Sequence, residues 1–420
     1  MFEGTVLHNR LPVFTAPMPA TRSVAVTVFV GAGSRYESDE VAGASHFLEH
    51  MLFKGTRRWP TAREISEAIE GVGGIFNAAT DRELTVYWVK IGRPFFLRAL
   101  EVLSDMLLHP LIPEQELEKE RSVIVEELNM TRDHPAHRAE QMLDELLWPD
   151  QPMGRDVGGT RDTVLSLPRQ AILDYMHRQY NPANAVVSVA GDLDPAAVAR
   201  AVEGCLGQWE PGQSLDWFPV RDGQRTPRLR VEFRRTDQAH VFLGLQAYPT
   251  LHPDRYAQDL LNVVLGEGMS SRLFLELREK RGLVYDVHSS VSHFRDTGSL
   301  VVSCGVDPKR SVQALKTILE ELERLKEGVS PQELLKAKEF SKGRLLLRTE
   351  DTRAVAMWVG AQQLLRGRVA TLDEVLERIE AVTTDDLTRV AGDLLHRERM
   401  CLSVVGPFRS ESRFAQALGL

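Results

Sequence analysis

An internal repeat is the feature of this sequence that most restricts the folds open to it. Residues 98–108 resemble residues 313–323, and residues 113–117 (PEQEL) resemble residues 331–335 (PQELL) at nearly the same separation. Two matches at nearly one separation indicate duplication of a domain about half as long as the chain. The length of 420 residues also exceeds one ordinary core, because domains typically hold roughly 100–200 residues.

A proline- and glycine-rich segment marks the boundary between the halves. Residues 209–229 are otherwise mostly polar, a composition typical of linkers. We therefore expect an N-terminal domain over residues 1–210, a linker over 211–227 and a homologous C-terminal domain over 228–420.

Strand-like and helix-like segments alternate within the first half. Segments rich in β-branched and aromatic residues predict strands at residues 23–32, 83–91 and 185–191. Helices are predicted at 62–71, at 168–178 and from Pro195, and the first of them begins with a Thr61/Glu64 capping box. The pattern predicts an α+β fold of two homologous domains, each a mostly antiparallel sheet packed with helices.

Composition narrows the class of protein. Hydrophobic residues at 43% and charged residues at 26% are ordinary for a globular protein. The net charge of -8 argues against a nucleic-acid binder and favours basic partners. The three cysteines, Cys205, Cys304 and Cys401, are too widely spaced for a disulfide framework or a cysteine zinc site, so we interpret them as buried or idle thiols.

The sequence carries no membrane signal. No run approaches 18 consecutive apolar residues, and the N-terminus lacks a charged region followed by an apolar one. We expect a cytoplasmic protein without membrane contact, unless a leader segment has been removed.

The segment His46-Phe-Leu-Glu-His50 predicts a metal site. Histidines four residues apart lie one helical turn apart on the same face, where both reach one Zn²⁺ at about 2.0–2.1 Å. Glu49, beside the second histidine, is placed to take a proton from water that the metal makes acidic. The alternative is a pair of helix histidines that only pack or face water, so a third ligand is the discriminating feature.

Residues 114–131 have helical periodicity and supply that ligand. Glu127 follows Val123 by four residues and Ile124 by three, which places it on the apolar stripe, whereas Glu126 shares a polar face. Because a buried carboxylate needs a partner, Glu127 is the better candidate. Glu120 lies on the same face and is expected to orient a histidine or the metal water. Without the two histidines, an exposed acidic helix would be the simpler interpretation.

These motifs resemble the pitrilysin family of zinc peptidases, especially its mitochondrial processing peptidase subfamily and bacterial relatives. The matching segments are HFLEHMLFKG at 46–55 and ERSVIVEE at 120–127. The resemblance spans nearly the whole chain and also selects Glu127. It implies one Zn²⁺ per chain and a peptide substrate bound as an added strand along residues 73–80, through Asn77 and Ala78.

The second half lacks a second His-x-x-Glu-His. Residues 266–282 do not match a phosphate-binding loop, and we predict a Ser-capped helix closed by Gly282. By resemblance, Arg278 and Tyr285 match a family pair that faces the zinc from a distant domain and holds substrate and oxyanion. The alternative is an exposed helix arginine and a core tyrosine.

The resemblance implies a zinc metalloendopeptidase that cleaves unfolded peptides inside a clamshell dimer. The larger single-chain relatives have four domains, so a chain of this length is expected to pair as a homodimer or with a homologous subunit. A non-catalytic core subunit of a larger assembly is the alternative of another class, disfavoured because all the candidate site residues are present. A zinc hydrolase acting on a non-peptide substrate is a third.

Overall fold

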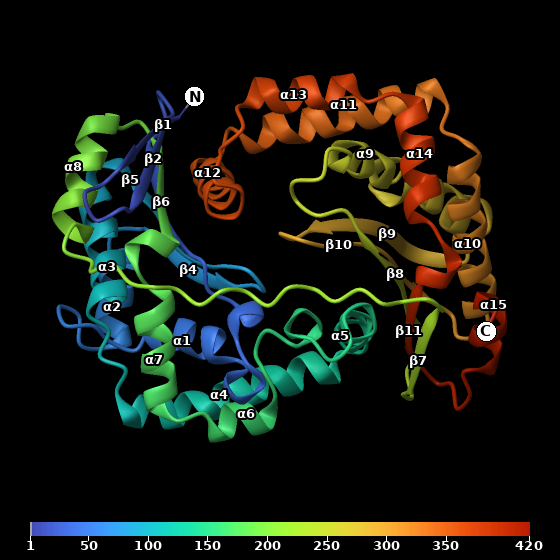
Figure 1. Ribbon diagram of the computed structural model, residues 1–420, viewed down its shortest axis with the longest axis horizontal. Helices are drawn as coiled ribbons and strands as arrows, with labels where there is room; N and C mark the ends of the chain where they lie inside the picture. Colours follow the sequence, from blue (N-terminus) through green and yellow to red (C-terminus); the bar gives the residue numbers. More distant parts are fainter. Residues whose placement is uncertain (1) are drawn as a thin grey trace. The chain divides into compact units, whose positions relative to one another are not determined.

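The computed structural model describes residues 2–420 and confirms the α+β class (Figure 1). The described chain divides into two compact units, each with its own sheet. The first unit takes in residues up to Leu128, Asp156–Phe218 and Leu346–Leu372. The second takes in Asn129–Arg155, Pro219–Leu345 and Asp373–Leu420.

The first sheet has six strands in the order β1-β2-β6-β3-β5-β4. They are β1 (Glu3–Val6), β2 (Pro12–Pro17), β3 (Ser23–Val30), β4 (Ile75–Thr80), β5 (Thr85–Gly92) and β6 (Ala185–Gly191). All pairs are antiparallel except β2 with β6. The three predicted strands correspond to β3, β5 and β6. Strand β6 has the predicted bounds, β3 ends two residues earlier than predicted, and β5 starts two residues later and ends one residue later.

The second sheet repeats this arrangement without a counterpart of β1. Its order is β7-β11-β8-β10-β9, with one parallel pair, β7 and β11. The strands are β7 (Arg228–Phe233), β8 (Ala239–Ala247), β9 (Val284–His293), β10 (Gly298–Val306) and β11 (Cys401–Gly406). Because strand order and direction match position by position, the duplication inferred from sequence is confirmed at the level of the fold.

Helices cover both sheets. Those mainly in the first unit are α1 (Ala44–Leu52), α2 (Ala62–Glu70), α3 (Phe96–Leu108), α4 (Glu114–Asp133), α6 (Arg161–Ser166), α7 (Arg169–Gln179), α8 (Pro195–Leu206) and α12 (Thr352–Arg366). Those mainly in the second are α5 (Pro135–Leu147), α9 (Arg255–Gly266), the π-helix η6 (Phe274–Lys280), α10 (Ser311–Glu327), α11 (Pro331–Arg348), α13 (Leu372–Ala381), α14 (Thr384–Leu394) and α15 (Ser412–Leu418). The Thr61/Glu64 capping box of α2 is present as predicted.

Two helices are exchanged between the sequence halves. In the second unit, α5 packs on β8 and β11 and buries Ala139 and Met142 against Val405. In the first unit, α12 packs on β3 and β6, with Ala356 in the cluster that contains Ala190. The compact units therefore cross the boundaries expected from sequence, because a linear repeat identifies a helix but not the sheet that its apolar face covers.

Candidate metal centre

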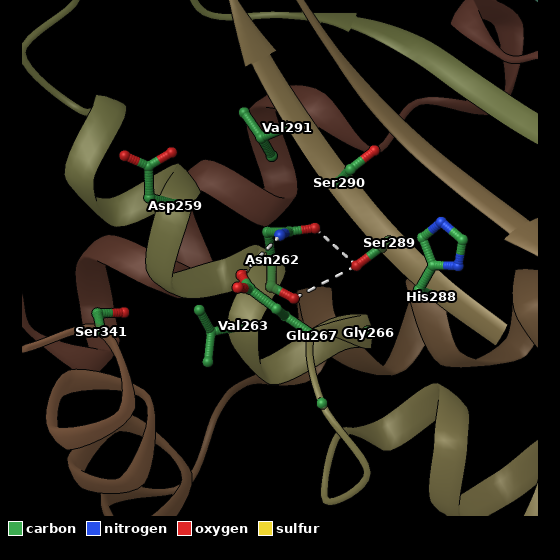
Figure 2. Close-up of a pocket in the computed structure, with 11 residues that line it drawn as sticks. Asp259, Asn262, Val263, Gly266, Glu267, His288, Ser289, Ser290, Val291 and Ser341 are labelled. Carbon is green, nitrogen blue, oxygen red and sulfur yellow. Dashed lines mark hydrogen bonds between the residues drawn. The ribbon is translucent and has the colours of Figure 1, made fainter. Parts of the chain in front are cut away.

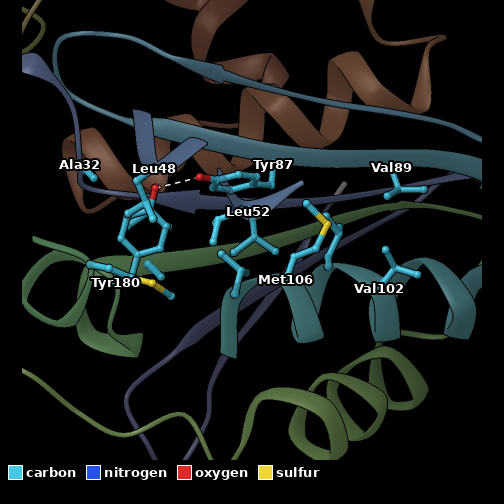
Figure 3. Packing of buried hydrophobic residues seen from close by; sticks show 14 of the residues in the cluster. Ala32, Leu48, Leu52, Tyr87, Val89, Val102, Met106 and Tyr180 are labelled. Atoms are coloured by element: carbon cyan, nitrogen blue, oxygen red, sulfur yellow. Dashed lines mark hydrogen bonds between the residues drawn. The ribbon is translucent and has the colours of Figure 1, made fainter. Parts of the chain in front are cut away.

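One face of α1 is apolar and packs into the core of the first unit, so its two histidines lie on the opposite face. Phe47, Leu48, Met51 and Leu52 are fully buried in the first unit's core. Leu48 and Leu52 lie near Tyr87, whose hydroxyl pairs with that of Tyr180 (Figure 3). His46, Glu49 and His50 lie on the helix face away from this core and stay partly exposed.

The start of α1 is held by a buried carboxylate. Both oxygens of Glu37 accept backbone hydrogen bonds, from Gly43 and from Ser45, at 2.7 Å each. A negative charge at a helix N-terminus is favourable because it meets unpaired N–H groups and the positive end of the dipole. Gly43 has φ 95°, a left-handed conformation that favours glycine.

Three potential ligand atoms converge above α1. His46 Nε2 and His50 Nε2 are 3.2 Å apart, and Oε2 of Glu127 is 3.8 Å from the first and 3.4 Å from the second. Ligands at about 2.0–2.1 Å from a tetrahedral ion are separated from one another by roughly 3.3 Å. The donor set therefore fits a zinc ion. Among residues 2–420, it is the group of three His, Cys, Asp or Glu side chains whose ligand atoms lie close enough together to hold one metal ion.

Glu120 orients His50. Its Oε1 lies 2.9 Å from Nδ1 of His50, and its Oε2 lies 2.6 Å from Nζ of Lys54. Burial by itself raises the pKa of Glu120, but the hydrogen bonds from His50 and Lys54 outweigh it and hold the pKa below its usual value. An ionised Glu120 accepts a hydrogen bond from Nδ1–H of His50, so that the lone pair of His50 Nε2 faces the position of the metal.

The pKa values of the two histidines are shifted in opposite directions. Burial, followed by the nearby His50, lowers the pKa of His46 to about 4. Burial also acts to lower the pKa of His50, but the hydrogen bond to Glu120 and the charge of Glu127 raise it overall. His46 is therefore neutral at physiological pH, the form that a metal ligand requires.

Glu49 lies beside the donor set and is held by a residue of the neighbouring strand. The Thr80 hydroxyl donates to Oε2 of Glu49 at 2.5 Å. Burial raises the pKa of Glu49, and the Thr80 hydrogen bond opposes that shift. A carboxylate with a raised pKa that is not one of the three converging donors suits the acceptance of a proton.

Thr80 ends β4, the strand at one edge of the first sheet. Asn77 is exposed and Ala78 is partly exposed on this strand. The Asn77 side-chain oxygen accepts a hydrogen bond from the backbone N–H of Ala78 at 2.8 Å. The predicted binding strand is therefore an edge strand that leads directly to Glu49, which the sequence had not linked to it.

The structure distinguishes the two glutamates of α4, although part of the sequence argument was wrong. Glu126 is exposed, whereas Glu127 reaches both histidines and is 42% exposed. Val123 is 43% exposed and does not belong to the buried stripe. That stripe instead contains Leu117, Glu120, Arg121, Ile124 and Val125, because α4 turns its Glu120 side, not its Val123 side, toward α1.

Arg278 and Tyr285 lie together in the second unit. The Arg278 guanidinium carbon is 4.7 Å from the Tyr285 ring centroid, and Nη1 donates to the Tyr285 carbonyl at 2.9 Å. Tyr285 is 77% exposed and so is not a core tyrosine.

A β-bulge explains how Tyr285 avoids the core. Val284 pairs with Val306 and Val287 pairs with Cys304, so that two residues of β9, Tyr285 and Asp286, lie opposite the single residue Gly305 of β10. Such an extra residue re-aims the side chains beside it.

The expected Ser-capped helix of residues 266–282 is incorrect in its details. Residues 274–280 form a π-helix, and the Ser271 hydroxyl donates to the Gly268 carbonyl instead of capping a helix N-terminus. The ending at Gly282, which has φ 54°, is as expected. A π-turn is a local widening that sequence periodicity does not show.

The second unit has a different side-chain set where the first unit has its metal centre. On α9, Asp259, Asn262 and Val263 have the spacing of His46, Glu49 and His50 on α1. Asn262 accepts a hydrogen bond from Ser289 of β9 at 2.6 Å through its side-chain oxygen (Figure 2). The second unit therefore has the corresponding helix and neighbouring strand but not the metal-binding side chains.

Three supporting residues had no assigned role in the sequence interpretation: Glu37, Lys54 and Thr80. Each acts through a partner that is distant in sequence, and no spacing pattern predicts such pairs. Among residues 2–420, no helix combines the length and the apolarity that crossing a bilayer requires.

The fold and the site together define a class of protein: a duplicated α+β chain with an inverted His-x-x-Glu-His metal motif. The profile of the Insulinase (Peptidase family M16) family matches residues 13–161, and that of the Peptidase M16 inactive domain matches residues 166–340. The chain therefore belongs to peptidase family M16, and the resemblance to the pitrilysin family is confirmed.

Relatives along the full length agree with this assignment. The chain is 38% identical to an uncharacterized zinc protease of Streptomyces coelicolor, over 97% of this chain and 91% of that protein. It is 36% identical to the uncharacterized zinc protease YmxG of Bacillus subtilis, over 97% and 98% of the two chains.

Solved structures show the same fold. A protease from Helicobacter pylori superimposes with a TM-score of 0.91 at 25% identity, covering 97% of this chain and 99% of that one. A chain of complex III2 from Candida albicans gives a TM-score of 0.85 at 18% identity, covering 99% of both chains. The second likeness shows the fold alone.

Proposed function

We propose that the protein is a zinc metalloendopeptidase that cleaves extended peptides. The convergence of His46 Nε2, His50 Nε2 and Glu127 at distances of 3.2 to 3.8 Å carries this proposal. The names of its zinc protease relatives agree with it. One Zn²⁺ per chain is expected, held by these three residues.

The zinc, when bound, supplies Lewis acidity and lowers the pKa of water to about 7. Glu49 accepts the proton of that water and later returns it to the leaving amine. Thr80 holds the Glu49 carboxylate in place, and Glu120 fixes the tautomer of His50. In a dimer, Tyr285 of a second copy would donate a hydrogen bond to the developing oxyanion, and Arg278 of that copy would hold Tyr285 and the substrate backbone.

The substrate adds as a strand to β4. An edge strand offers unpaired backbone groups, so an extended peptide aligned along Asn77 and Ala78 reaches Glu49 through the same strand that carries Thr80. This arrangement favours peptides and disordered segments over folded domains. We further propose that the protein works as a dimer, closed around its substrate, in the cytoplasm.

The test combines metal analysis with cleavage of an unstructured peptide. The wild type should bind one zinc per chain and cleave. Glu49→Gln should keep the zinc while kcat/KM falls by roughly 10²–10⁴-fold, because the ligands survive and the proton acceptor does not. Glu127→Ala should lose zinc and cleavage, whereas Glu126→Ala, its exposed neighbour, should keep both.

Two results would contradict these assignments. Normal cleavage by Glu49→Gln would reject Glu49 as the proton acceptor. A wild-type protein that binds zinc but cleaves no peptide would favour the alternative, a non-catalytic subunit of a larger assembly.

A further inference from the structure

The second unit contains a cavity beside Tyr285 that the proposed chemistry does not use. Its volume is about 240 Å³, below the roughly 300–1,000 Å³ of small-molecule sites, so it has room for a side chain and not for a cofactor. It lies between the start of α5 and strands β8, β9 and β10. We call it the Phe242 cavity, and it is lined by Ala136, Gln238, His240, Phe242, Tyr285, Asp286, His288, Ser303, Cys304 and Gly305.

The bulge in β9 places Tyr285 at this cavity. Because Tyr285 and Asp286 lie opposite the single residue Gly305, both are pushed out of the regular alternation of β9. The Arg278 guanidinium packs on the Tyr285 ring and binds its carbonyl, which fixes the backbone at the bulge. A peptide whose backbone contacts Tyr285 therefore passes the cavity.

The chemistry of the lining favours an uncharged occupant. Asp286 is the one carboxylate of the lining, and its side chain is 69% exposed, 3.6 Å from Nδ1 of His288. The Ser303 hydroxyl is paired with Nε2 of His288 at 3.1 Å. Burial, and then the neighbouring His134, lower the pKa of His240, which favours the neutral ring.

Phe242, Ala136, Gly305 and the Tyr285 ring also line the cavity and supply carbon surface. An anionic side chain inserted there would meet Asp286, and a cationic one would find only a carboxylate that is already hydrated and lies beside His288. An apolar side chain instead gains about 25 cal/mol per Å² buried. We propose that the Phe242 cavity receives one large apolar or aromatic side chain of the peptide substrate and so determines specificity. This proposal rests on the proposed peptidase function.

Gly305 gives a sharp test. A Cβ at Gly305 would point to Oε1 of Gln238, 2.9 Å away, with no backbone atom of another segment within 4 Å. The Gln238 side chain is exposed and can move. Gly305→Val therefore grows into the cavity without straining the sheet. Ser292→Val, an exposed position of the same sheet outside the lining, is the matched control.

The experiment measures binding and cleavage of unstructured peptides in which leucine replaces alanine at one position at a time. Binding is read by fluorescence anisotropy on the zinc-loaded Glu49→Gln protein, with and without Gly305→Val or Ser292→Val. At one position, leucine should improve binding and kcat/KM by roughly tenfold or more, the scale of a filled apolar pocket. Gly305→Val should reduce that preference to about threefold or less, and Ser292→Val should leave it intact.

The outcomes separate this inference from the proposed function. A leucine preference unchanged by Gly305→Val, or an equal loss on all peptides, overturns the cavity assignment while cleavage still supports a peptidase. A preference lost in binding without any cleavage by the wild type supports the cavity and overturns the peptidase. Failure of every peptide to bind overturns both. Gln238→Phe, which closes the cavity from its rim, replaces Gly305→Val if that variant does not fold.

Discussion

At the scale of single residues, the candidate site depends on side chains that position others. Thr80 holds Glu49, Glu120 holds His50, and Lys54 holds Glu120. None of the three supporting side chains belongs to the converging donor set. Their contribution is to reduce the number of arrangements that the reacting groups can adopt, which is where much of a metal site's affinity and rate originates.

We expect Glu120→Gln to weaken zinc binding by roughly 10–100-fold without abolishing it. The amide can still contact His50 Nδ1, but it lacks the charge that favours the required tautomer and pairs with Lys54. Competition with a zinc indicator measures the dissociation constant. Glu118→Gln, an exposed residue of the same helix, is the control, and equal zinc affinity in both variants would reject the positioning role.

At the scale of elements, the exchanged helix α12 packs unusually closely on its sheet. A Cβ at Gly360 would lie 2.3 Å from the ring of Phe29, whereas a Cβ at Gly343 of α11 would meet no atom within 4 Å. The same substitution should therefore have opposite effects at two helical glycines.

Gly343→Ala should stabilise the protein by roughly 0.5–1 kcal/mol, because alanine is the better helix former. Gly360→Ala should destabilise it by about 1–3 kcal/mol in spite of that propensity, because the helix must move off β3. Urea denaturation of the full chain measures both. A stabilised Gly360→Ala would show that α12 does not pack on its sheet as described.

The segment that leads into the π-helix η6 is anchored to α11 by an ion pair. Nε of Arg272 lies 2.7 Å from Oε1 of Glu333. The other carboxylate oxygen, Oε2, accepts hydrogen bonds from the backbone N–H and the hydroxyl of Ser330. The Arg272 hydrogen bond is the largest cause of the lowering of the Glu333 pKa from 4.5 to about 2.

Because the pKa of Glu333 is lower in the folded state, its stabilising effect is present above pH 4.5 and is lost as the pH falls toward 2. Glu333→Gln should therefore cost about 1 kcal/mol at pH 7, and the difference from the wild type should shrink between pH 4.5 and pH 3. Unfolding free energies across this range test it. A difference that stays constant with pH would assign the loss to packing instead of charge.

At the scale of the whole molecule, the two candidate groups of residues lie in different units. The zinc ligands belong to the first unit, and Arg278 and Tyr285 belong to the second. The resemblance implies that each zinc is completed by the pair from another chain, and a two-fold dimer would then contain two equivalent shared sites.

Mixing two inactive variants tests that arrangement. Glu49→Gln and Tyr285→Phe should each be strongly impaired alone. After subunit exchange, about half the dimers are mixed and half of their sites are whole, so about a quarter of wild-type activity should return if the site is shared. No recovery, with exchange verified by differently tagged subunits, would place Tyr285 at the zinc of its own chain.

The sequence by itself determined the fold class, the repeat and the identity of the convergent donors, because these depend on local patterns. A four-residue spacing places His46 and His50 on one helix face, and a strand's composition or a capping box acts over a few neighbouring residues. The periodicity argument for Glu127 was partly wrong, because Val123 is exposed, but Glu127 lies near both histidines as expected.

Only the tertiary structure decided which distant groups meet. The Thr80 bond to Glu49, the Glu37 cap on α1 and the exchange of α5 and α12 join segments with no mutual sequence signal. The bulge that exposes Tyr285 is a one-residue shift in the register between β9 and β10. The amino-acid composition of the two strands does not specify such a shift. Contacts of this kind are set by the packing of whole sheets and helices, so no local pattern specifies them.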